Sequence, residues 1–433
     1  MTPKRFIGIF VLFVIIITAL WFFLRGDSLT NKNGNGGTDA DNLSSLFPFS
    51  KEGTPTLEQK NTGGGAPTFT DIPNPDRAEQ INTMGNLTQV TNRLVAGYTP
   101  ITTTAQTQKK TPERNIVSRE SEPTPDNQPE LRFVERGTGY VFNINALGKN
   151  EKKVSGTTIL RASNALFANN GKTVIEQYIK NDNTTVATFV GAIDDTAPSG
   201  GKINGEFLPD DIYDITVSSD GNSILFLTPT DEGTAGITIK YDRTLRKQVF
   251  TSPFTEWLAE WTKSGMYLFT KASGFAQGYA YKVLNNGTFE KIIGDITGLT
   301  IKPSPDGSTI LYNSGGENIL SLHYIMIKDG TDLDSSLKTL PEKCVWGKNS
   351  IVFYCGVPNE LPNGIYPDAW YRGQANFSDS IWKVDTKEGR ITRLTNNTPY
   401  SFDATKLTLD TDEKYLYFVN KKDFSLWSLD LTK

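Results

Sequence analysis

The sequence has one histidine and two cysteines among its 433 residues. These counts exclude metal sites built from Cys and His, which need three or four such ligands. No Gly-x-Ser-x-Gly segment occurs, and a catalytic triad would have to use His323, which lies in a segment that alternates like a strand. We therefore expect no metal site, no cofactor and no serine-hydrolase chemistry.

An excess of basic charge is also missing. The chain carries 44 Lys and Arg against 48 Asp and Glu, which gives a formal net charge of -4 at pH 7. A nucleic-acid binder presents a strongly basic surface that neutralises phosphates. We therefore expect no nucleic-acid partner. Hydrophobic residues make up 37% of the chain, which is enough for a substantial folded core.

An uncharged apolar segment occupies residues 6–24. A helix needs about 20 apolar residues to cross the hydrocarbon core of a bilayer. Lys4 and Arg5 precede the segment, so the positive-inside rule places the N-terminus in the cytoplasm and the rest of the chain outside. The alternative is a cleaved signal peptide, whose apolar core is shorter and is followed by small residues. We predict a cytoplasmic tip over 1–5 and a transmembrane anchor over 6–24, which makes the membrane one partner.

Residues 25–85 are rich in Asn, Gly, Thr, Pro and Ser. A segment of this composition cannot bury enough apolar area to offset the entropy lost on ordering. We predict a disordered, flexible stalk. Apolar residues between 81 and 94 also recur at helical spacing, so a helix that begins at Asn74-Pro75 is the alternative for the end of this region.

The rest of the chain repeats a polar turn followed by a short, β-rich apolar run. Examples are SSDGNSILFLT (218–228), SPDGSTILYNS (304–314) and TDEKYLYFVN (411–420). Pro, Asp and Gly suit tight turns, and β-branched and aromatic residues suit half-buried strands. A third strand with period-two alternation follows some of these runs, as at 381–385, and a fourth strand follows at 391–395. Four antiparallel strands in each repeat are the unit of a β-propeller.

The second strands of these repeats begin near residues 131, 173, 222, 266, 308, 350 and 414. We therefore predict an all-β, seven-bladed β-propeller over 86–433, with six or eight blades as alternatives. The last repeat lacks its fourth strand, and residues 87–91 resemble that strand in pattern. We expect this N-terminal strand to close the ring, because closure removes exposed sheet edges. Residues 102–129 and 358–379 are then loop insertions.

Ser304-Pro305-Asp306-Gly307 and the strand that follows it resemble the TolB-type, WD40-like repeat, which also builds the propeller of prolyl oligopeptidases. Ser218-Ser219-Asp220-Gly221 is a degenerate copy. The resemblance covers roughly 85–433 and concerns architecture, since the motif builds a turn. It implies an extracytoplasmic propeller that binds other proteins or components of the cell envelope.

Cys344 and Cys355 flank the turn at 347–350. Directly opposed residues in a hairpin have Cβ atoms about 4.5–5.5 Å apart, which is close to the distance that a disulfide needs. A disulfide persists outside the cytoplasm. We predict this bond, with two buried free thiols as the alternative.

The insertion 358–379 has the composition of a binding surface, because aromatic residues and arginine concentrate at interface hot spots. The alternative is a loop that folds over its own blade. The candidate partner-binding residues in the insertion are Tyr366, Trp370, Tyr371, Arg372 and Phe377.

These patterns together predict a membrane-anchored, extracytoplasmic propeller, in the periplasm or at the cell surface, that binds a protein or an envelope polymer. The alternative is a carbohydrate-active hydrolase or lyase with carboxylates at the mouth of the propeller channel. Inward-pointing pairs of Asp or Glu on the first strands of blades would favour this alternative. The first strands read from the sequence, such as 215–217 and 407–409, are uncharged. The acidic residues between 194 and 214 are expected in a surface loop.

Overall fold

The computed structural model describes residues 83–102, 128–194, 201–395 and 399–433. All of these residues belong to the unit Leu43–Lys433. The predicted tip, the anchor over 6–24, nearly all of the stalk and most of the insertion 102–129 lie outside them. Across the described ranges, no helix has both the length and the apolar character needed to cross a membrane.

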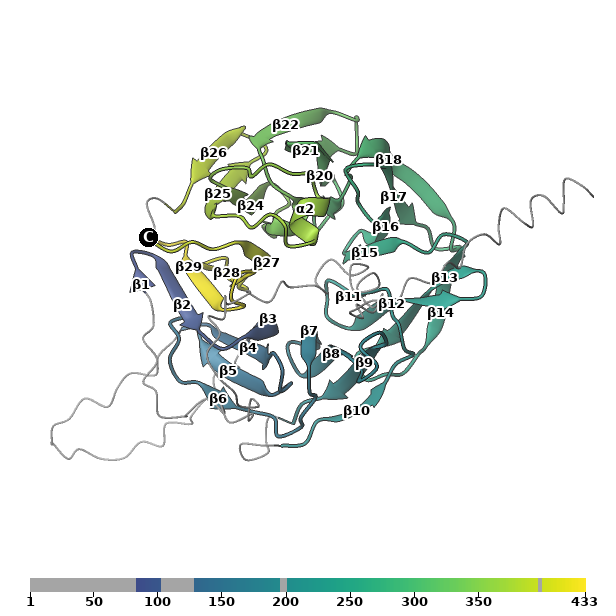
Figure 1. Cartoon of the computed structure of the whole chain (residues 1–433), viewed down its shortest axis with the longest axis vertical. Helices are drawn as coiled ribbons and strands as arrows, with labels where there is room; N and C mark the ends of the chain where they lie inside the picture. Colours follow the sequence, from purple (N-terminus) through teal and green to yellow (C-terminus); the bar gives the residue numbers. More distant parts are fainter. Residues whose placement is uncertain (1–82, 103–127, 195–200, 396–398) are drawn as a thin grey trace, which may run out of the picture. The chain divides into compact units, whose positions relative to one another are not determined.

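Seven antiparallel sheets stand around a ring (Figure 1). Six sheets have four strands and one has five. Within each four-stranded sheet, the strands pair in chain order from the innermost strand outward. The predicted all-β, seven-bladed propeller is therefore confirmed, and the alternatives of six or eight blades are excluded.

Blades are numbered here from the N-terminus, and each is given from its inner strand outward. Blade 1 contains β3 (Val95–Ile101), β4 (Glu130–Glu135), β5 (Val141–Asn145) and β6 (Lys152–Lys153). Blade 2 contains β7 (Ala162–Ala168), β8 (Thr173–Ile179), β9 (Val186–Ala192) and β10 (Asn204–Phe207). Blade 3 contains β11 (Asp214–Val217), β12 (Ser223–Thr230), β13 (Gly233–Lys240) and β14 (Lys247–Ser252).

Blade 4 contains β15 (Trp257–Thr262), β16 (Gly265–Thr270), β17 (Gln277–Val283) and β18 (Phe289–Thr297). Blade 5 contains β19 (Ile301–Pro303), β20 (Thr309–Gly316), β21 (Ile319–Met326) and β22 (Asp332–Leu337). Blade 6 follows the short 3-10 helix η2 (Pro341–Lys343) and contains β23 (Cys344–Trp346), β24 (Val352–Pro358), β25 (Asp379–Asp385) and β26 (Arg390–Arg393), with the short helix α2 (Asp368–Tyr371) between β24 and β25.

Blade 7 combines strands from both ends of the described chain. Its order is β27 (Ala404–Leu409), β28 (Tyr415–Asn420), β29 (Leu426–Asp430), β2 (Leu87–Thr91) and β1 (Thr83–Met84). Leu87 lies opposite Leu429 in the antiparallel pair of β2 and β29. Residues 87–91 therefore form a strand and not the alternative helix. That this strand closes and stabilises the ring stays a prediction.

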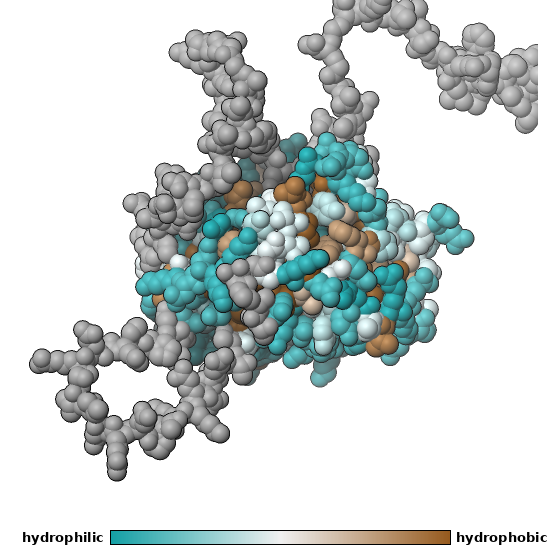
Figure 2. All heavy atoms as spheres, turned by 90° about the horizontal axis from the view of Figure 1, so that it is seen from below, coloured by the Kyte–Doolittle hydropathy of each residue, from teal (hydrophilic) through white to brown (hydrophobic). Residues whose placement is uncertain are grey.

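The core lies between neighbouring blades, where their sheets pack face to face. Ile175 and Val190 of blade 2, for example, share one buried cluster with Ile224 and Phe226 of blade 3. Each blade is covered on both faces by its neighbours in the ring. The second strands are therefore nearly continuous apolar runs in the sequence. Figure 2 shows one outer side of the ring, where hydrophobic residues reach the surface in separate patches among hydrophilic ones.

The Ser-Pro-Asp-Gly motif builds the turn between β19 and β20. The hydroxyl of Ser304 donates to Asp306, and the same hydroxyl accepts from the backbone of Thr309. Gly307 has a φ of 71°, which glycine adopts without steric cost. Ser218 and Asp220 repeat the side-chain bond in blade 3, where Gly221 has the same φ. The recurring motif therefore has a local, turn-forming role.

Candidate functional site

The insertion between β24 and β25 lies at one particular end of the ring. Strands within a blade run antiparallel, so the connection from a second to a third strand lies at the same end as the connection from one blade to the next. Residues 359–378 therefore share an end with Ser273 of blade 4, Asn318 of blade 5 and Lys421 of blade 7, which all follow second strands. Figure 1 shows α2 drawn over the inner part of the ring, next to β20 and β24.

Three of the five predicted binding residues in the insertion are buried. Tyr366, Trp370 and Phe377 have no exposed surface. They form one apolar cluster together with Leu320 and Leu340 of the neighbouring blade. The Phe377 ring centroid lies 5.9 Å from that of Tyr366 and 6.2 Å from that of Trp370. These aromatic rings attach the insertion to the propeller and do not face solvent.

The other two predicted residues lie nearer the surface. Tyr371 is half-buried, and its hydroxyl donates to the carboxylate of Glu342. Arg372 is exposed, and its guanidinium lies 3.6 Å from Asp368. The composition of the insertion signalled interface residues, but the same residue types also build small buried cores.

A buried ionic cluster lies beneath the insertion. Nζ of Lys343, on η2, lies 2.7 Å from Asp379 and also contacts Asp403. Asp403 in turn accepts hydrogen bonds from the Trp370 indole at 2.9 Å and from the Phe377 backbone at 3.1 Å. The cluster therefore joins η2, β25 and the segment before β27 to the middle and the C-terminal end of the insertion.

The charges in this cluster perturb one another. Burial by itself lowers the pKa of Lys343, but the adjacent carboxylates of Asp379 and Asp403 outweigh that effect and raise the pKa above its usual value. Burial raises the pKa of Asp379 to about 6, against the opposing effect of the Lys343 charge. The lysine is thus held as a cation within the protein.

The insertion is also bonded to blades 4, 5 and 7. The carboxylate of Asp368 accepts from the Gly274 backbone at 2.6 Å and from the Ser273 hydroxyl at 3.2 Å. Asn318 exchanges backbone and side-chain bonds with Gly364. Nζ of Lys421 donates to the carbonyl of Trp370 at 2.7 Å. With its own blade, the insertion is therefore fixed to four of the seven blades.

Exposed apolar residues flank these attachment points. Phe275, next to Gly274, is 71% exposed, and Ile319, next to Asn318, is 56% exposed. Both residues lie at the same end of the ring as Arg372 of the insertion. We call Phe275, Ile319, Tyr371 and Arg372 the insertion face.

A cavity of about 420 Å³ lies against the inner strands of blades 1, 2, 3 and 7. Its lining comes from β3, β7, β11 and β27, from β8 and β9 of blade 2, and from Tyr213 just before β11. The lining includes Leu166, Phe167, Val186, Tyr213, Asp214 and Ile215.

Four inner strands carry charged side chains: Asp214 on β11, Glu260 on β15, Lys302 on β19 and Lys406 on β27. The prediction that the first strands are uncharged is therefore wrong. The range 215–217 leaves out Asp214, the first residue of β11, and the range 407–409 leaves out Lys406, because β27 begins at Ala404. Glu260 is not isolated, since it lies 2.8 Å from Lys302 of the next blade.

Asp214 is half-buried and lines the cavity. Its oxygens accept hydrogen bonds from the backbone of Ile215 at 2.9 Å and of Ala259 at 2.7 Å. Burial raises the pKa of Asp214 to about 7, and the charge of Glu260 adds to the effect, while the two hydrogen bonds oppose it. The side chain therefore titrates near neutral pH.

Lys406 joins blade 7 to blades 1 and 2. Its Nζ donates to the carbonyl of Ala96 at 2.6 Å and to the side chain of Asn164 at 2.7 Å. Lys406 has a φ of 52° where the β27 pairing is irregular. A non-glycine residue in this region is strained, and surrounding contacts must hold it there.

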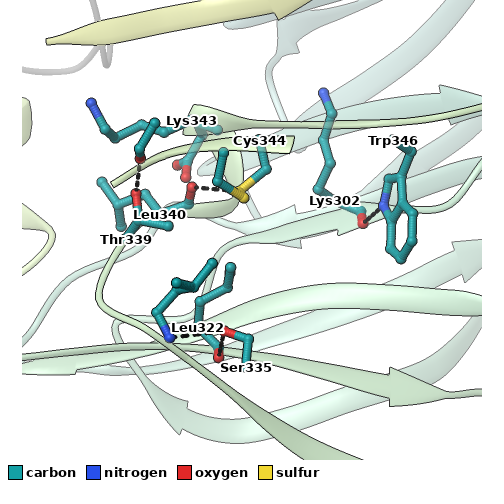
Figure 3. The surroundings of a disulfide bond; sticks show 12 residues. Lys302, Leu322, Ser335, Thr339, Leu340, Lys343, Cys344 and Trp346 are labelled. Atoms are coloured by element: carbon teal, nitrogen blue, oxygen red, sulfur yellow. Dashed lines mark hydrogen bonds between the residues drawn. A yellow bond between two sulfur atoms is a disulfide. The ribbon is translucent and has the colours of Figure 1, made fainter. Parts of the chain in front are cut away.

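The two cysteines form a disulfide that joins β23 to β24 (Figure 3). Cys344 and Cys355 lie directly opposite each other in this pair, as the hairpin spacing predicts. Near them, the Trp346 indole donates to the carbonyl of Lys302 at 3.0 Å (Figure 3). The disulfide therefore lies within blade 6, in the buried cluster that packs this blade against blade 5. His323 lies on β21 and stacks on Tyr312.

No protein-family model matches the sequence, and no curated protein matches it. Solved structures do match. TolB from Acinetobacter baumannii has a TM-score of 0.37 and 11% identity over 67% of this chain and 59% of its own. Puromycin hydrolase has a TM-score of 0.44 and 13% identity over 69% of this chain and 49% of its own. A protein from Lactobacillus plantarum has a TM-score of 0.42 and 14% identity over 65% of this chain and 84% of its own.

The matched region spans little more than half of the TolB chain and about half of the puromycin hydrolase chain. At these identities the likeness concerns the fold and carries no activity to this protein. The seven-bladed architecture rests on the strand pairing described above.

Proposed function

We propose that this protein is a membrane-anchored, extracytoplasmic propeller that binds a protein or an envelope polymer through the insertion face. The observation that carries the proposal is the attachment of residues 359–378 to four blades, with exposed Phe275 and Ile319 beside the attachment points. A surface that is rigid before binding loses less conformational entropy when a partner docks.

The contact residues differ from those that the sequence alone suggests. Tyr366, Trp370 and Phe377 support the insertion from below, so the proposed contacts are Phe275, Ile319, Arg372 and the half-buried Tyr371. Aromatic and arginine side chains are enriched among the residues that contribute most of the energy of protein interfaces. Deletion of the whole insertion would uncover its apolar cluster, so point variants test the surface better.

The test is site-specific photo-crosslinking in the full chain within its own membrane. A photoreactive residue replaces Phe275 or Ile319, and the control position is Leu245, which is 74% exposed in the turn between β13 and β14 at the opposite end of the ring. We expect the same adduct from both insertion-face positions and none from Leu245. Equal adducts at all three positions, or none at any, contradict the proposal.

The membrane anchor and extracytoplasmic location are part of the same proposal. Their support is the uncharged segment 6–24 and the basic residues Lys4 and Arg5 before it. The disulfide between Cys344 and Cys355 agrees with an oxidising compartment, because such bonds are rare in the cytosol.

A carbohydrate-active hydrolase or lyase is a second candidate, favoured by the carboxylates of Asp214 and Glu260 on neighbouring inner strands. A carboxyl group that titrates near neutral pH suits general acid chemistry. The test is turnover of a glycan panel by the purified chain. If the unaltered protein turns over a glycan and both Asp214→Asn and Glu260→Gln abolish that turnover, the result favours this candidate. If the unaltered protein turns over none of the glycans tested, the candidate is rejected for those substrates.

A further inference from the structure

The inner-strand cavity and the insertion are built mainly from different blades, although both involve blade 7. The insertion is bonded to blades 4 to 7, whereas the cavity is lined mainly by the inner strands of blades 1, 2, 3 and 7. Its volume of about 420 Å³ suits a small organic molecule. None of the residues that line the cavity belongs to the insertion face.

Asp214 is the acidic group of this cavity. The hydrogen-bond partners of its two oxygens are backbone amides, and the charged group that affects it is the like-charged Glu260. No lysine or arginine in the described ranges pairs with it. A carboxylate that is partly removed from water and has no cation beside it is costly, so a positively charged ligand gains free energy by neutralising it.

The surroundings of Asp214 define the rest of the ligand. Ile215 and Tyr213 flank it on the chain, and Phe167 and Val186 of blade 2 line the same cavity. Lys406 lines it too, but its ammonium is held by Ala96 and Asn164 of blades 1 and 2. A cationic group of the ligand is therefore attracted to Asp214 and repelled by Lys406. An apolar part of the ligand gains free energy when it is buried against the hydrophobic side chains.

We propose that this cavity binds a small organic amine, whose ammonium group pairs with Asp214 and whose apolar body lies against Phe167, Val186 and Ile215. The ammonium donates hydrogen bonds to the carboxylate oxygens, which keep their backbone donors from Ile215 and Ala259. Tyr213, also in the lining, offers an aromatic face for the cation.

The probe is phenethylamine, and its matched neutral control is 2-phenylethanol, which has nearly the same shape. Calorimetric titration uses the full chain in detergent. We expect the amine to bind at least about tenfold more tightly than the alcohol, because a charge-assisted hydrogen bond is worth more than a neutral one. Equal affinity for the two probes, or no detectable amine binding, overturns the proposal.

The pH dependence supplies a test without any variant. The amine keeps its proton well above pH 8, like a lysine side chain. The carboxyl of Asp214, with a pKa of about 7, gains its charge between pH 6 and pH 8. The affinity for phenethylamine should therefore rise over this interval while that for 2-phenylethanol stays flat. A flat profile for the amine contradicts pairing with Asp214.

Two variants localise the interaction. Asp214→Asn removes the charge, so amine affinity should fall about tenfold and lose its rise with pH. Glu260→Gln removes a negative charge from the next inner strand, from a residue outside the cavity lining, and should change the affinity by less than about threefold. Equal effects of the two changes reject the site. If the Asp214 variant does not fold, the two probes and the pH profile still decide.

Discussion

The ammonium nitrogen of Lys343 lies 2.7 Å from Oδ2 of Asp379, and neither side chain has any exposed surface. The two residues come from η2 and β25, on either side of the insertion in the sequence. Asp403 shares the same ammonium from the segment before β27. The attachment of the insertion therefore depends on a charge that is buried under it.

Replacement of this lysine is expected to destabilise the protein strongly. Lys343→Met leaves Asp379 and Asp403 close together in the interior without a cation, and breaking a buried ion pair from one side costs about 3–5 kcal/mol. Lys414→Met is the control, because Lys414 pairs with Asp412 at the exposed surface, where such pairs contribute about 0–1 kcal/mol. Urea unfolding measures the free energy of unfolding of both variants. A similar small loss of stability in the two variants would contradict the structural role of Lys343.

Glu176 should make stability depend on pH. The side chain is buried on β8, neither carboxyl oxygen has a hydrogen-bond partner in the described structure, and burial raises its pKa to about 8. Between the ordinary value of 4.5 and about 8, the folded state keeps a proton that the unfolded state has released. Stability therefore falls as pH rises through this window, by roughly 1.4 kcal/mol for each pKa unit at most.

The variant Glu176→Gln tests this dependence. It removes the titrating group, so its stability should fall less between pH 5 and pH 8 than that of the unaltered protein. Glu290→Gln, at an exposed position on β18, serves as the control and should keep the original pH profile. Urea midpoints across pH give the measurement, and an unchanged slope in Glu176→Gln would disprove the assignment.

Two leucines test whether the N-terminal strand closes the ring. Leu87, on β2, is 2% exposed and lies opposite Leu429, whereas Leu94 is 50% exposed. Leu87→Ala should lower stability by about 2–5 kcal/mol, because it leaves a cavity in the seventh blade. Leu94→Ala should change it by about 0.5 kcal/mol or less. Thermal unfolding measures the stability of both variants. Equal losses of stability in Leu87→Ala and Leu94→Ala would mean that β2 does not contribute to the stability of the closed ring.

Loss of the disulfide should lower stability without removing the fold. The bond closes a short loop, with a sequence separation of 11, between β23 and β24. Replacement of Cys344 and Cys355 by alanine should cost about 2–3 kcal/mol on loop-closure grounds. A reductant should lower the urea midpoint of the unaltered protein but not that of the double variant. Detection of two labelled thiols in the native, non-reduced protein would reject the bond.

The anchor predicts a membrane location that depends on residues 6–24. The full chain should stay in the membrane pellet after alkaline carbonate extraction, and a chain that begins at residue 26 should be released. Intact-mass measurement separates the anchor from the cleaved signal peptide. A mature protein that lacks residues 1–24 would contradict the anchor and support cleavage.

Local patterns in the sequence were sufficient for the architecture. The turn at Ser304–Gly307 forms from bonds among residues a few positions apart, and glycine at 307 fits its positive φ. The apolar runs after such turns predict second strands because both sheet faces are buried between blades. Repetition of this local signal around the chain gave the seven blades, and hairpin spacing placed Cys344 opposite Cys355.

Tertiary structure alone decided which side chains face solvent and which charges meet. Residue type alone predicts Trp370 to be an interface residue, but its indole donates to Asp403 inside the molecule, 33 positions away in the chain. Asp214 similarly receives the amide of Ala259 from the next blade, 45 positions away. Such partners are brought together only when the ring forms, so residue type and local period predict the strands but not the burial, pKa or accessibility of these groups.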